Sequence, residues 1–221
     1  MIVAIAGASG LTGSLTLDLL LSESRVTKIY SIGRRKTGIS HPKLHEIMLE
    51  NGELAVDLSV EAFICCLGTT IKKAGSQEKF REVDHDLPLK LAVKLKNNGC
   101  RSAAVVSALG ADAHSRFFYN KVKGEMEEDL KKIGFKTLTI LRPSLIRGDR
   151  KETRPGEKSA EIILNIVSPL LIGPLKQWKA TEATDIAQAL LTSSINQKEG
   201  IFIFSSQEIK VVASSESGSK L

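Results

Sequence analysis

The sequence lacks the long hydrophobic runs that membrane-spanning helices require, although 42% of its 221 residues are hydrophobic. A spanning helix needs about 20 consecutive, predominantly apolar residues. The nearest candidate, residues 162–172, is interrupted by Asn165, Ser168 and Pro169. We therefore expect no membrane insertion, and a mean hydropathy of −0.02 is typical of a globular protein with a full core.

Cysteine is scarce as well, with three residues, two of them adjacent: Cys65, Cys66 and Cys100. An odd number argues against a framework of disulfides. Neither these cysteines nor the four histidines show the short spacing that metal ligands need. We expect reduced, structural cysteines and no metal site.

Aromatic residues make up only 5% of the chain, and no motif for nucleic-acid binding is present. The net charge is +6, but basic and acidic residues are interleaved, as in residues 125–132 (EMEEDLKK). Such interleaving is typical of a solvent-exposed helix face. We expect no nucleic-acid partner, and the positive charge favours an anionic small molecule.

The N-terminus shows no charged segment followed by an apolar stretch and a cleavage site, because an apolar strand begins at once. This pattern predicts a cytoplasmic protein. The last three residues, Ser219, Lys220 and Leu221, match a peroxisomal address, which leaves a peroxisomal location as the alternative.

What the sequence does contain is a regular alternation of strand-like and helix-like segments. Such alternation requires a parallel sheet covered on both faces, so it predicts an α/β fold with a Rossmann-like, doubly wound parallel sheet. We expect a single domain over residues 1–213, with a small substrate-side region at residues 143–199 and a disordered tail at residues 214–221. The predicted strands are residues 1–6, 27–32, 45–49, 62–67, 102–107, 136–141 and 200–204, and the predicted helices are residues 11–21, 77–97, 118–132, 160–167 and 185–193, the last with Thr184 as its N-cap.

A glycine-rich turn joins the first strand to the first helix. Gly7, Gly10 and Gly13 are spaced three residues apart. In this context glycines allow a sharp turn, a close approach of the backbone to a phosphate, and tight packing of the helix on the strand. The helix N-terminus then offers free N–H groups and a partial positive charge. The turn predicts a dinucleotide-binding site.

The second strand ends in a basic turn, Gly33-Arg34-Arg35-Lys36. An NAD enzyme places an Asp or Glu about 20 residues after the glycine turn, to bind the ribose 2′-hydroxyl. Arginines stand there instead, and a guanidinium binds a phosphate through two hydrogen bonds. This favours the 2′-phosphate of NADP(H), and a solvated basic turn is the alternative.

A second loop, Leu67-Gly68-Thr69-Thr70, follows the fourth strand. The loops at the carboxyl ends of the central strands line the ligand crevice of a doubly wound sheet. Gly68 allows a close approach there, and the two threonines can bind ribose or phosphate. An ordinary turn is the equally weighted alternative.

Three residues after the central strands predict catalysis. Tyr119 and Lys123 are four residues apart and share one helix face, and Ser107 ends the preceding strand. A cationic Lys123 and a nicotinamide would lower the pKa of the Tyr119 phenol and let it exchange a proton with a substrate oxygen. Ser107 would hold that oxygen, and Lys123 would also hold the ribose.

These features together resemble the atypical branch of the short-chain dehydrogenase/reductase superfamily, and more narrowly the Tat-interacting-protein (oxidoreductase) family with its bacterial relatives. The resemblance covers residues 2–157. It implies a Rossmann fold that binds NADP(H). The stretches that carry it are GASGLTG, IGRRK, CCLGTT followed by KAG, the pair Val83-Asp84, YxxVKGE from Tyr119, and LRP followed by DRxExRPGE. The implied cofactor contacts are Gly7, Ser9, Gly10, Leu11, Thr12, Gly13, Arg34, Arg35, Leu67, Gly68, Thr69, Tyr119 and Lys123, with Pro143, Ser144 and Leu145 at the nicotinamide; the implied catalytic residues are Ser107, Tyr119 and Lys123.

Two departures from the family pattern concern the substrate and adenine sides. Ala108 stands where relatives have a second serine, and the stretch over residues 50–61 is short.

The expected function is an NADP(H)-dependent oxidoreductase acting on an unidentified carbonyl or alcohol. The alternative is a non-catalytic NADP(H)-binding redox sensor or regulatory scaffold. A sugar-nucleotide epimerase is disfavoured, because little chain is left after Pro143 for a large substrate domain. The sequence leaves open whether the chain forms a homodimer.

Overall fold

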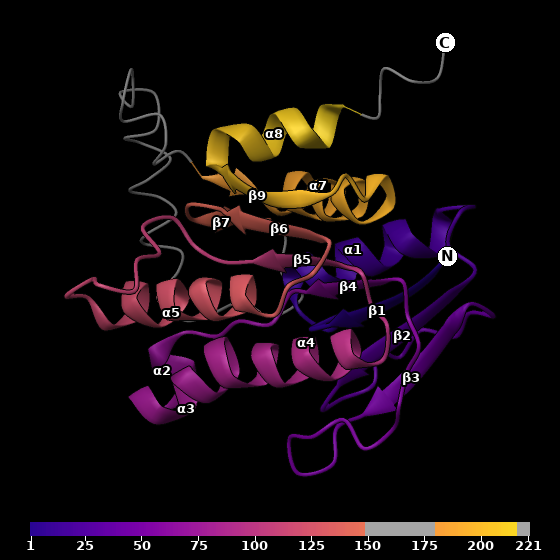
Figure 1. Ribbon diagram of the computed structural model, residues 1–221, viewed down its shortest axis with the longest axis horizontal. Coiled ribbons are helices and arrows are strands. Elements are labelled where there is room, and N and C mark those ends of the chain that lie inside the picture. Colours follow the sequence, from indigo (N-terminus) through magenta and orange to yellow (C-terminus); the bar gives the residue numbers. More distant parts are fainter. Residues whose placement is uncertain (149–179, 216–221) are drawn as a thin grey trace.

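The computed structural model describes residues 1–148 and 180–215. Its centre is a seven-stranded sheet in the order β3-β2-β1-β4-β5-β6-β9 (Figure 1). Each neighbouring pair is parallel, which confirms the predicted doubly wound α/β fold. The strands are β1 (Ile2–Ala6), β2 (Lys28–Gly33), β3 (Leu44–Met48), β4 (Ala62–Cys65), β5 (Ser102–Val106), β6 (Thr137–Arg142) and β9 (Gly200–Ser205).

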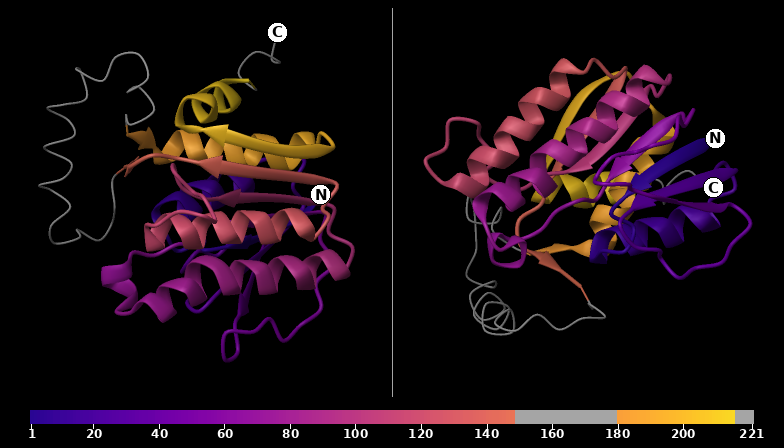
Figure 2. Two further views of the ribbon diagram at one scale, coloured as in Figure 1. Left: turned by 60° about the vertical axis from the view of Figure 1, so that its left-hand side comes forward. Right: turned by 90° about the horizontal axis from the view of Figure 1, so that it is seen from below.

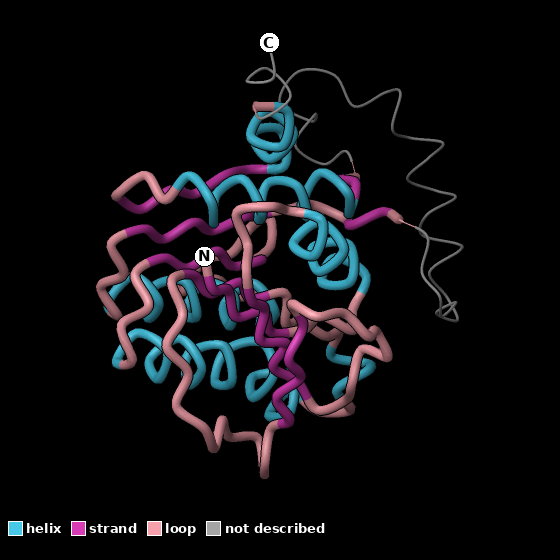
Figure 3. The backbone as a smooth tube through the Cα atoms, turned by 90° about the vertical axis from the view of Figure 1, so that its right-hand side faces the viewer, coloured by secondary structure: helices cyan, strands magenta, loops and turns pink. Residues whose placement is uncertain are grey.

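Helices cover both faces of the sheet (Figure 2). Helices α4 and α5 lie on one face, where their apolar residues form one core cluster with the strands. Helices α1 and α7 pack together on the other face in a second cluster, with α8 beside α7. The twist of the strands between the helices is visible in Figure 3. The helices are α1 (Leu11–Ser22), α2 (Ile71–Ala74), α3 (Gln77–Arg81), α4 (Leu87–Asn97), α5 (Phe118–Lys132), α7 (Ala183–Asn196) and α8 (Ser206–Ser214).

The central strands β1, β4 and β5 are apolar apart from Ser102, because helices bury them from both sides. Every residue of β4 and β5 is buried. From β1 the chain builds the sheet first toward β2 and β3, and then returns to add β4 on the other side of β1. The carboxyl ends of β1 and β4 therefore flank the point where ligands bind in doubly wound sheets.

The helix predicted over residues 77–97 is not continuous. Between α3 and α4 lies a π-helical turn, η1 (Glu82–Asp86), in which the N–H of Leu87 bonds to the carbonyl of Glu82. Pro88 follows this turn. A proline inside an α-helix clashes with the carbonyl four residues earlier, here that of Asp84, and the wider turn relieves the clash.

Helix α7 corrects two predictions. It begins at Ala183 with Glu182 as its cap residue, so Thr184 lies inside the helix and is not its N-cap. Its apolar side packs in the core against α1. Residues 183–196 therefore belong to the helical layer and not to a substrate-side region. The helix predicted over residues 160–167 lies outside the described residues.

Four further elements, α2, α8 and two short strands, were not predicted. Helix α8 begins with a capping box, in which the side chains of Ser205 and Glu208 bond to each other's backbone N–H groups. It runs through Ser214, so the predicted disordered tail does not begin there; residues 216–221 lie outside the described part of the chain. Strands β7 (Ile146–Arg147) and β8 (Thr181–Glu182) form a separate parallel pair. No helix in the described ranges is both long and apolar enough to cross a membrane.

Candidate active site

The glycine turn brings β1, β4 and α1 into close contact. Gly7 has a φ of +85°, and a Cβ there would lie 2.7 Å from the carbonyl oxygen of Cys66. A Cβ on Gly13 would lie 2.1 Å from the carbonyl oxygen of Gly7. Only glycine fits at these two positions. Gly10 is less crowded, since its Cβ would meet one atom, at 3.3 Å.

The N-terminus of α1 is open to an anion. Gly10 is the cap residue, and no side chain caps the first turn. The unpaired N–H groups of a first turn, together with the helix dipole, attract negative charge. Ser9 is exposed and Leu11 half-buried, whereas Thr12 is buried. At the start of α1 the structure thus leaves Ser9 and Gly10 exposed and Leu11 half-buried but encloses the side chain of Thr12.

One pocket joins this turn to the predicted arginines. It is lined by parts of the glycine turn, the end of β2, the basic turn and the loop after β4. Arg34 and Arg35 are exposed, and no acidic residue in the described ranges forms an ion pair with either of them. Their charges are therefore available to a ligand. The lining residues are Gly7, Ala8, Ser9, Ser31, Ile32, Gly33, Arg34, Arg35 and Leu67.

Lys123 forms a buried ion pair with Asp84 of the π-helical turn. Its Nζ lies 2.7 Å from Asp84 Oδ1, and the two residues are 4% and 0% exposed. Oδ2 of Asp84 accepts a 2.8 Å hydrogen bond from the backbone N–H of Thr69. Burial is the largest single effect on Lys123 and lowers its pKa, but the charge and hydrogen bond of Asp84, together with Tyr119 and Cys65, outweigh it, so the pKa is raised. Lys123 is therefore a cation at neutral pH.

Tyr119 lies one helical turn before Lys123 and is 36% exposed. Its ring packs against the buried Phe80, with 5.4 Å between ring centroids. Burial raises the pKa of the Tyr119 phenol, and the opposing effect of Lys123 is smaller. The sequence led us to expect a lowered pKa for Tyr119, from the charges of Lys123 and a bound nicotinamide together. The protein's own groups alone do not lower it.

Ser107 donates its hydroxyl proton to the carboxylate of Glu127. Both residues are buried, at 4% and 1% exposure. Arg142 at the end of β6 also binds Glu127, with Nε 3.0 Å from Oε1 and Nη2 2.5 Å from Oε2. Within the described residues no hydrogen bond joins Ser107 to Tyr119 or Lys123. The structure therefore brings Tyr119 and Lys123 together and assigns the proton of Ser107 to a separate network.

The segment predicted to face the nicotinamide is held by the loop after β5 and by the first residue of α8. The carbonyl of Pro143 accepts a 2.8 Å hydrogen bond from the N–H of Leu109. The N–H of Ser144 donates to the hydroxyl of Ser206 at 2.7 Å. Leu145 is 41% exposed. The loop after β6 thus has fixed backbone partners and one exposed apolar side chain.

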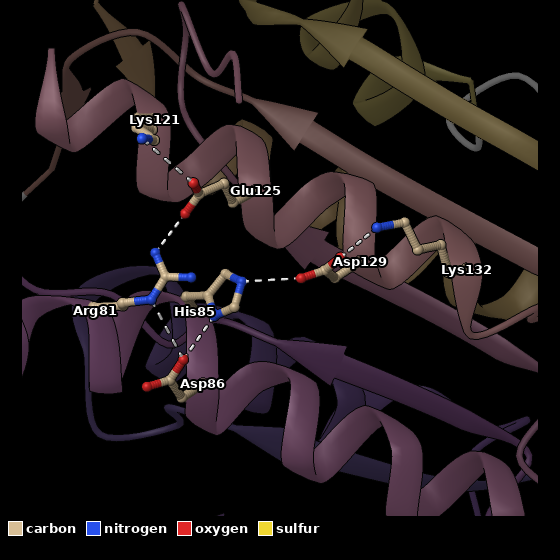
Figure 4. Close-up of polar contacts among 7 residues, drawn as sticks. All are labelled: Arg81, His85, Asp86, Lys121, Glu125, Asp129 and Lys132. Carbon is tan, nitrogen blue, oxygen red and sulfur yellow. Dashed lines mark hydrogen bonds and ion pairs between the residues drawn. The ribbon is translucent and has the colours of Figure 1, made fainter. Parts of the chain in front are cut away.

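A polar network holds α3 and the π-helical turn against α5 (Figure 4). His85 lies between two carboxylates, with Nδ1 2.7 Å from Asp86 and Nε2 3.2 Å from Asp129. Arg81 binds Glu125 of α5. These contacts connect α3, η1 and α5, and the last two also carry the buried ion pair between Asp84 and Lys123.

The three cysteines are free thiols. Burial raises the pKa of Cys65 and of Cys100 to about 11, and it raises the pKa of Cys66 as well. All three stay protonated at neutral pH and are poor nucleophiles. Over residues 1–148 and 180–215, no group of three or more His, Cys, Asp or Glu residues is arranged to hold a metal ion.

Asp84, Glu127 and Arg142 are the site residues whose partners the sequence did not reveal. For Glu127 a signal existed, because it lies four residues after Lys123 and so continues the same helix face. Asp84 belonged to a family motif without an assigned role. Asp84 and Arg142 find their partners in distant segments, and no local pattern encodes that pairing.

The family model named HIM1 matches residues 25–170. The mitochondrial protein fmp52 of Emericella nidulans is 35% identical over 208 residues, which are 90% of this chain and 89% of that protein. The protein HTATIP2 of Rattus norvegicus is 38% identical over 162 residues, 70% of this chain and 66% of that protein.

Solved structures of low sequence identity share the fold. A short-chain dehydrogenase/reductase superfamily protein from Agrobacterium tumefaciens with bound NAD has a TM-score of 0.69 at 13% identity, covering 93% of this chain and 77% of its own. The Bordetella bronchiseptica enzyme WbmH in complex with NAD+ has a TM-score of 0.65 at 18% identity. The match covers 96% of this chain and 79% of the WbmH chain. These structures share the Rossmann-like fold of this chain.

The relatives correct the expected location. Fungal relatives that are 31–36% identical are named mitochondrial, which contradicts the cytoplasmic prediction and its peroxisomal alternative. The suspected family itself is confirmed by the extent and identity of these matches. The chain belongs to the HIM1 family, whose members include the fungal fmp52 proteins and which is related to HTATIP2.

Proposed function

We propose that this protein is an NADP(H)-dependent oxidoreductase that interconverts a carbonyl and an alcohol. The observation that carries the proposal is the pocket in which the glycine turn and Arg34 and Arg35 meet. The solved neighbours from Agrobacterium tumefaciens and Bordetella bronchiseptica hold NAD, which supports dinucleotide binding by this chain.

The residues present fit a dinucleotide with a 2′-phosphate. Gly7 and Gly13 give the backbone the close approach that a pyrophosphate needs, and the uncapped start of α1 supplies N–H donors. Arg34 and Arg35 are exposed beside this turn, and guanidinium groups bind phosphate through charge-assisted hydrogen bonds. The bound cofactor would supply or accept the hydride.

Tyr119 is the proposed proton donor and acceptor for the substrate oxygen. It is partly exposed, so its hydroxyl can meet a substrate, and Lys123 is the cation that favours its phenolate. Lys123 would also bind the ribose. Ser107 would contribute less than the predicted triad implies, because its proton is donated to Glu127.

Cofactor preference tests the binding half of the proposal. We expect NADPH to bind about 10- to 150-fold more tightly than NADH, since one charge-assisted hydrogen bond contributes about 1.5–3 kcal/mol. Arg34→Ala should remove most of this preference, measured by titrating both cofactors by nicotinamide fluorescence. The matched control is Arg25→Ala. Arg25 is also exposed, but it is paired with Glu23 and precedes the start of β2, whereas Arg34 follows its end. Equal affinities for the two cofactors in the parent protein would contradict the proposal.

A second candidate is a non-catalytic NADP(H)-binding sensor or regulatory scaffold. The observation that favours it is the commitment of the Ser107 proton to Glu127, which leaves the predicted triad incomplete. Both candidates require cofactor binding. Only the enzyme requires NADPH consumption with a carbonyl compound, so turnover separates them.

A further inference from the structure

We propose that Asp84 is the positioning residue of this site, holding Lys123 and the Thr69 loop in a single arrangement. This role rests on the proposed function, in which Lys123 binds the ribose, and on the cofactor contacts that the sequence predicts for residues 67–69. Asp84 would touch neither cofactor nor substrate and would act through these two neighbours.

The carboxylate of Asp84 uses each oxygen for a different segment. Oδ1 lies 2.7 Å from Lys123 Nζ on α5, and Oδ2 accepts the hydrogen bond of 2.8 Å from Thr69. A Cβ on Gly68 would lie 3.5 Å from Oδ1 and 3.9 Å from Nζ. The loop therefore crosses directly over the ion pair, and one carboxylate fixes both the loop and the lysine.

Stability alone does not explain this pair. Taking two charges out of water costs several kcal/mol per ion, and well-packed apolar residues of similar volume often replace a buried ion pair without loss of stability. Removing one partner, in contrast, leaves a buried charge uncompensated. A 0% exposed Asp84 beside a 4% exposed Lys123 is therefore a costly arrangement, and its position next to Tyr119 indicates a role in the chemistry.

The π-helical turn puts Asp84 and its neighbours to different uses. Asp84 is fully buried against Lys123, whereas His85 and Asp86 take part in the polar network with α5 (Figure 4). Single π-helical turns inside α-helices are frequently found at functional sites. Two adjacent residues of the turn thus serve the ion pair with Lys123 (Asp84) and the contact with Asp129 of α5 (His85).

The consequence for Tyr119 passes through the charge of Lys123. The groups that act on Lys123 are Asp84 from η1, Tyr119 from α5 and the protonated thiol of Cys65 from β4. Of these only Asp84 is an acidic residue, and it forms the ion pair with Lys123. Without it, burial would lower the pKa of Lys123, and the cation that favours the Tyr119 phenolate would be lost.

The first measurement is the protonation of Lys123, followed by 15N NMR of the full chain labelled at lysine. Its signal is assigned by its loss in Lys123→Ala. Asp84→Asn keeps an oxygen for the Thr69 N–H and removes only the charge, so we expect Lys123 to lose its proton about two or more pH units lower than in the parent. The control Asp86→Asn changes an acid of the same turn with a 44% exposed side chain and should leave Lys123 unchanged. An identical titration in Asp84→Asn and the parent would overturn the proposal.

The second measurement is NADPH affinity, by nicotinamide fluorescence. Asp84→Ala removes both contacts and should weaken NADPH binding about 10-fold or more, since a charge-assisted hydrogen bond is lost. Asp86→Ala should stay within about two-fold of the parent, as surface substitutions usually do. Equal affinities of Asp84→Ala and Asp86→Ala would contradict the role of Asp84 in holding the loop.

The two measurements separate this inference from the proposed function. If the parent does not bind NADPH, the proposed function fails, and the titration of Lys123 still tests the ion pair. If neither Asp84 variant folds, the titration of Lys123 in the parent protein tests the proposal. A Lys123 signal that stays protonated beyond about pH 10, the ordinary lysine range, supports the role of Asp84, and one that titrates below about pH 9 overturns it.

Discussion

At the scale of single residues, Ser107 and Lys123 are each bound to a buried acid. Asp84 binds Lys123 and Glu127 binds Ser107. The spacing of four residues predicted that Tyr119 and Lys123 share a helix face, since helical periodicity is a local property. The two acids could not be assigned to these partners from the sequence, because burial and pairing depend on how distant segments pack.

Ser107→Ala is expected to cost stability more than turnover. Its hydroxyl bonds to a buried carboxylate, and losing such a bond costs about 1.5–3 kcal/mol, or about 3–12 °C in melting temperature for a chain of this size. Turnover should fall by less than about 10-fold, well short of the loss typical of a general acid or base.

The matched control is Ser194→Ala. Ser194 is fully buried, and its hydroxyl has no hydrogen-bond partner among the described residues, so its removal should leave the melting temperature near that of the parent. Differential scanning fluorimetry and a turnover assay measure both effects. A large loss of turnover in Ser107→Ala without a loss of stability would restore Ser107 as the residue that holds the substrate oxygen.

At the scale of elements, the sequence predicted best where the signal is local. The strands of the sheet and α5 (residues 118–132) were found by their periodicity, and the glycine turn by its spacing. Helix α8 was missed, although Ser205 and Glu208 carry a capping-box signature that could have revealed it. The π-helical turn before Pro88 was missed because the helical pattern continues through it, and only the clash of the proline ring indicates a break.

Gly13→Ala and Gly10→Ala test the glycine turn as a packing device. A Cβ on Gly13 would overlap the carbonyl of Gly7 at 2.1 Å, whereas one on Gly10 would meet it at 3.3 Å. Overpacking costs about 1–3 kcal/mol, so Gly13→Ala should melt about 2–12 °C lower than the parent and bind NADPH more weakly. Gly10→Ala should melt closer to the parent. Equal melting temperatures of the two variants would show that the turn adapts to a side chain.

At the scale of the whole molecule, the architecture was predictable and the cellular location was not. Alternating strands and helices, with no long apolar run, are compatible with few folds, and the parallel sheet follows from them. Location depends on recognition by targeting machinery, which the composition of a folded domain does not encode. The substrate is equally unpredictable, because its pocket depends on loop shapes that the fold does not fix.

Turnover by the parent protein and by Tyr119→Phe tests the central claim most directly. The substitution removes one oxygen and keeps the ring that packs on Phe80, so folding and NADPH affinity should stay near parental values. NADPH consumption is followed over a panel of aldehydes and ketones. We predict turnover by the parent and a loss of about 10²- to 10⁴-fold in Tyr119→Phe, the range typical of general acid–base catalysis. Equal turnover of the two proteins, or none by a parent that binds NADPH, would contradict the claim that Tyr119 is the proton donor of an oxidoreductase.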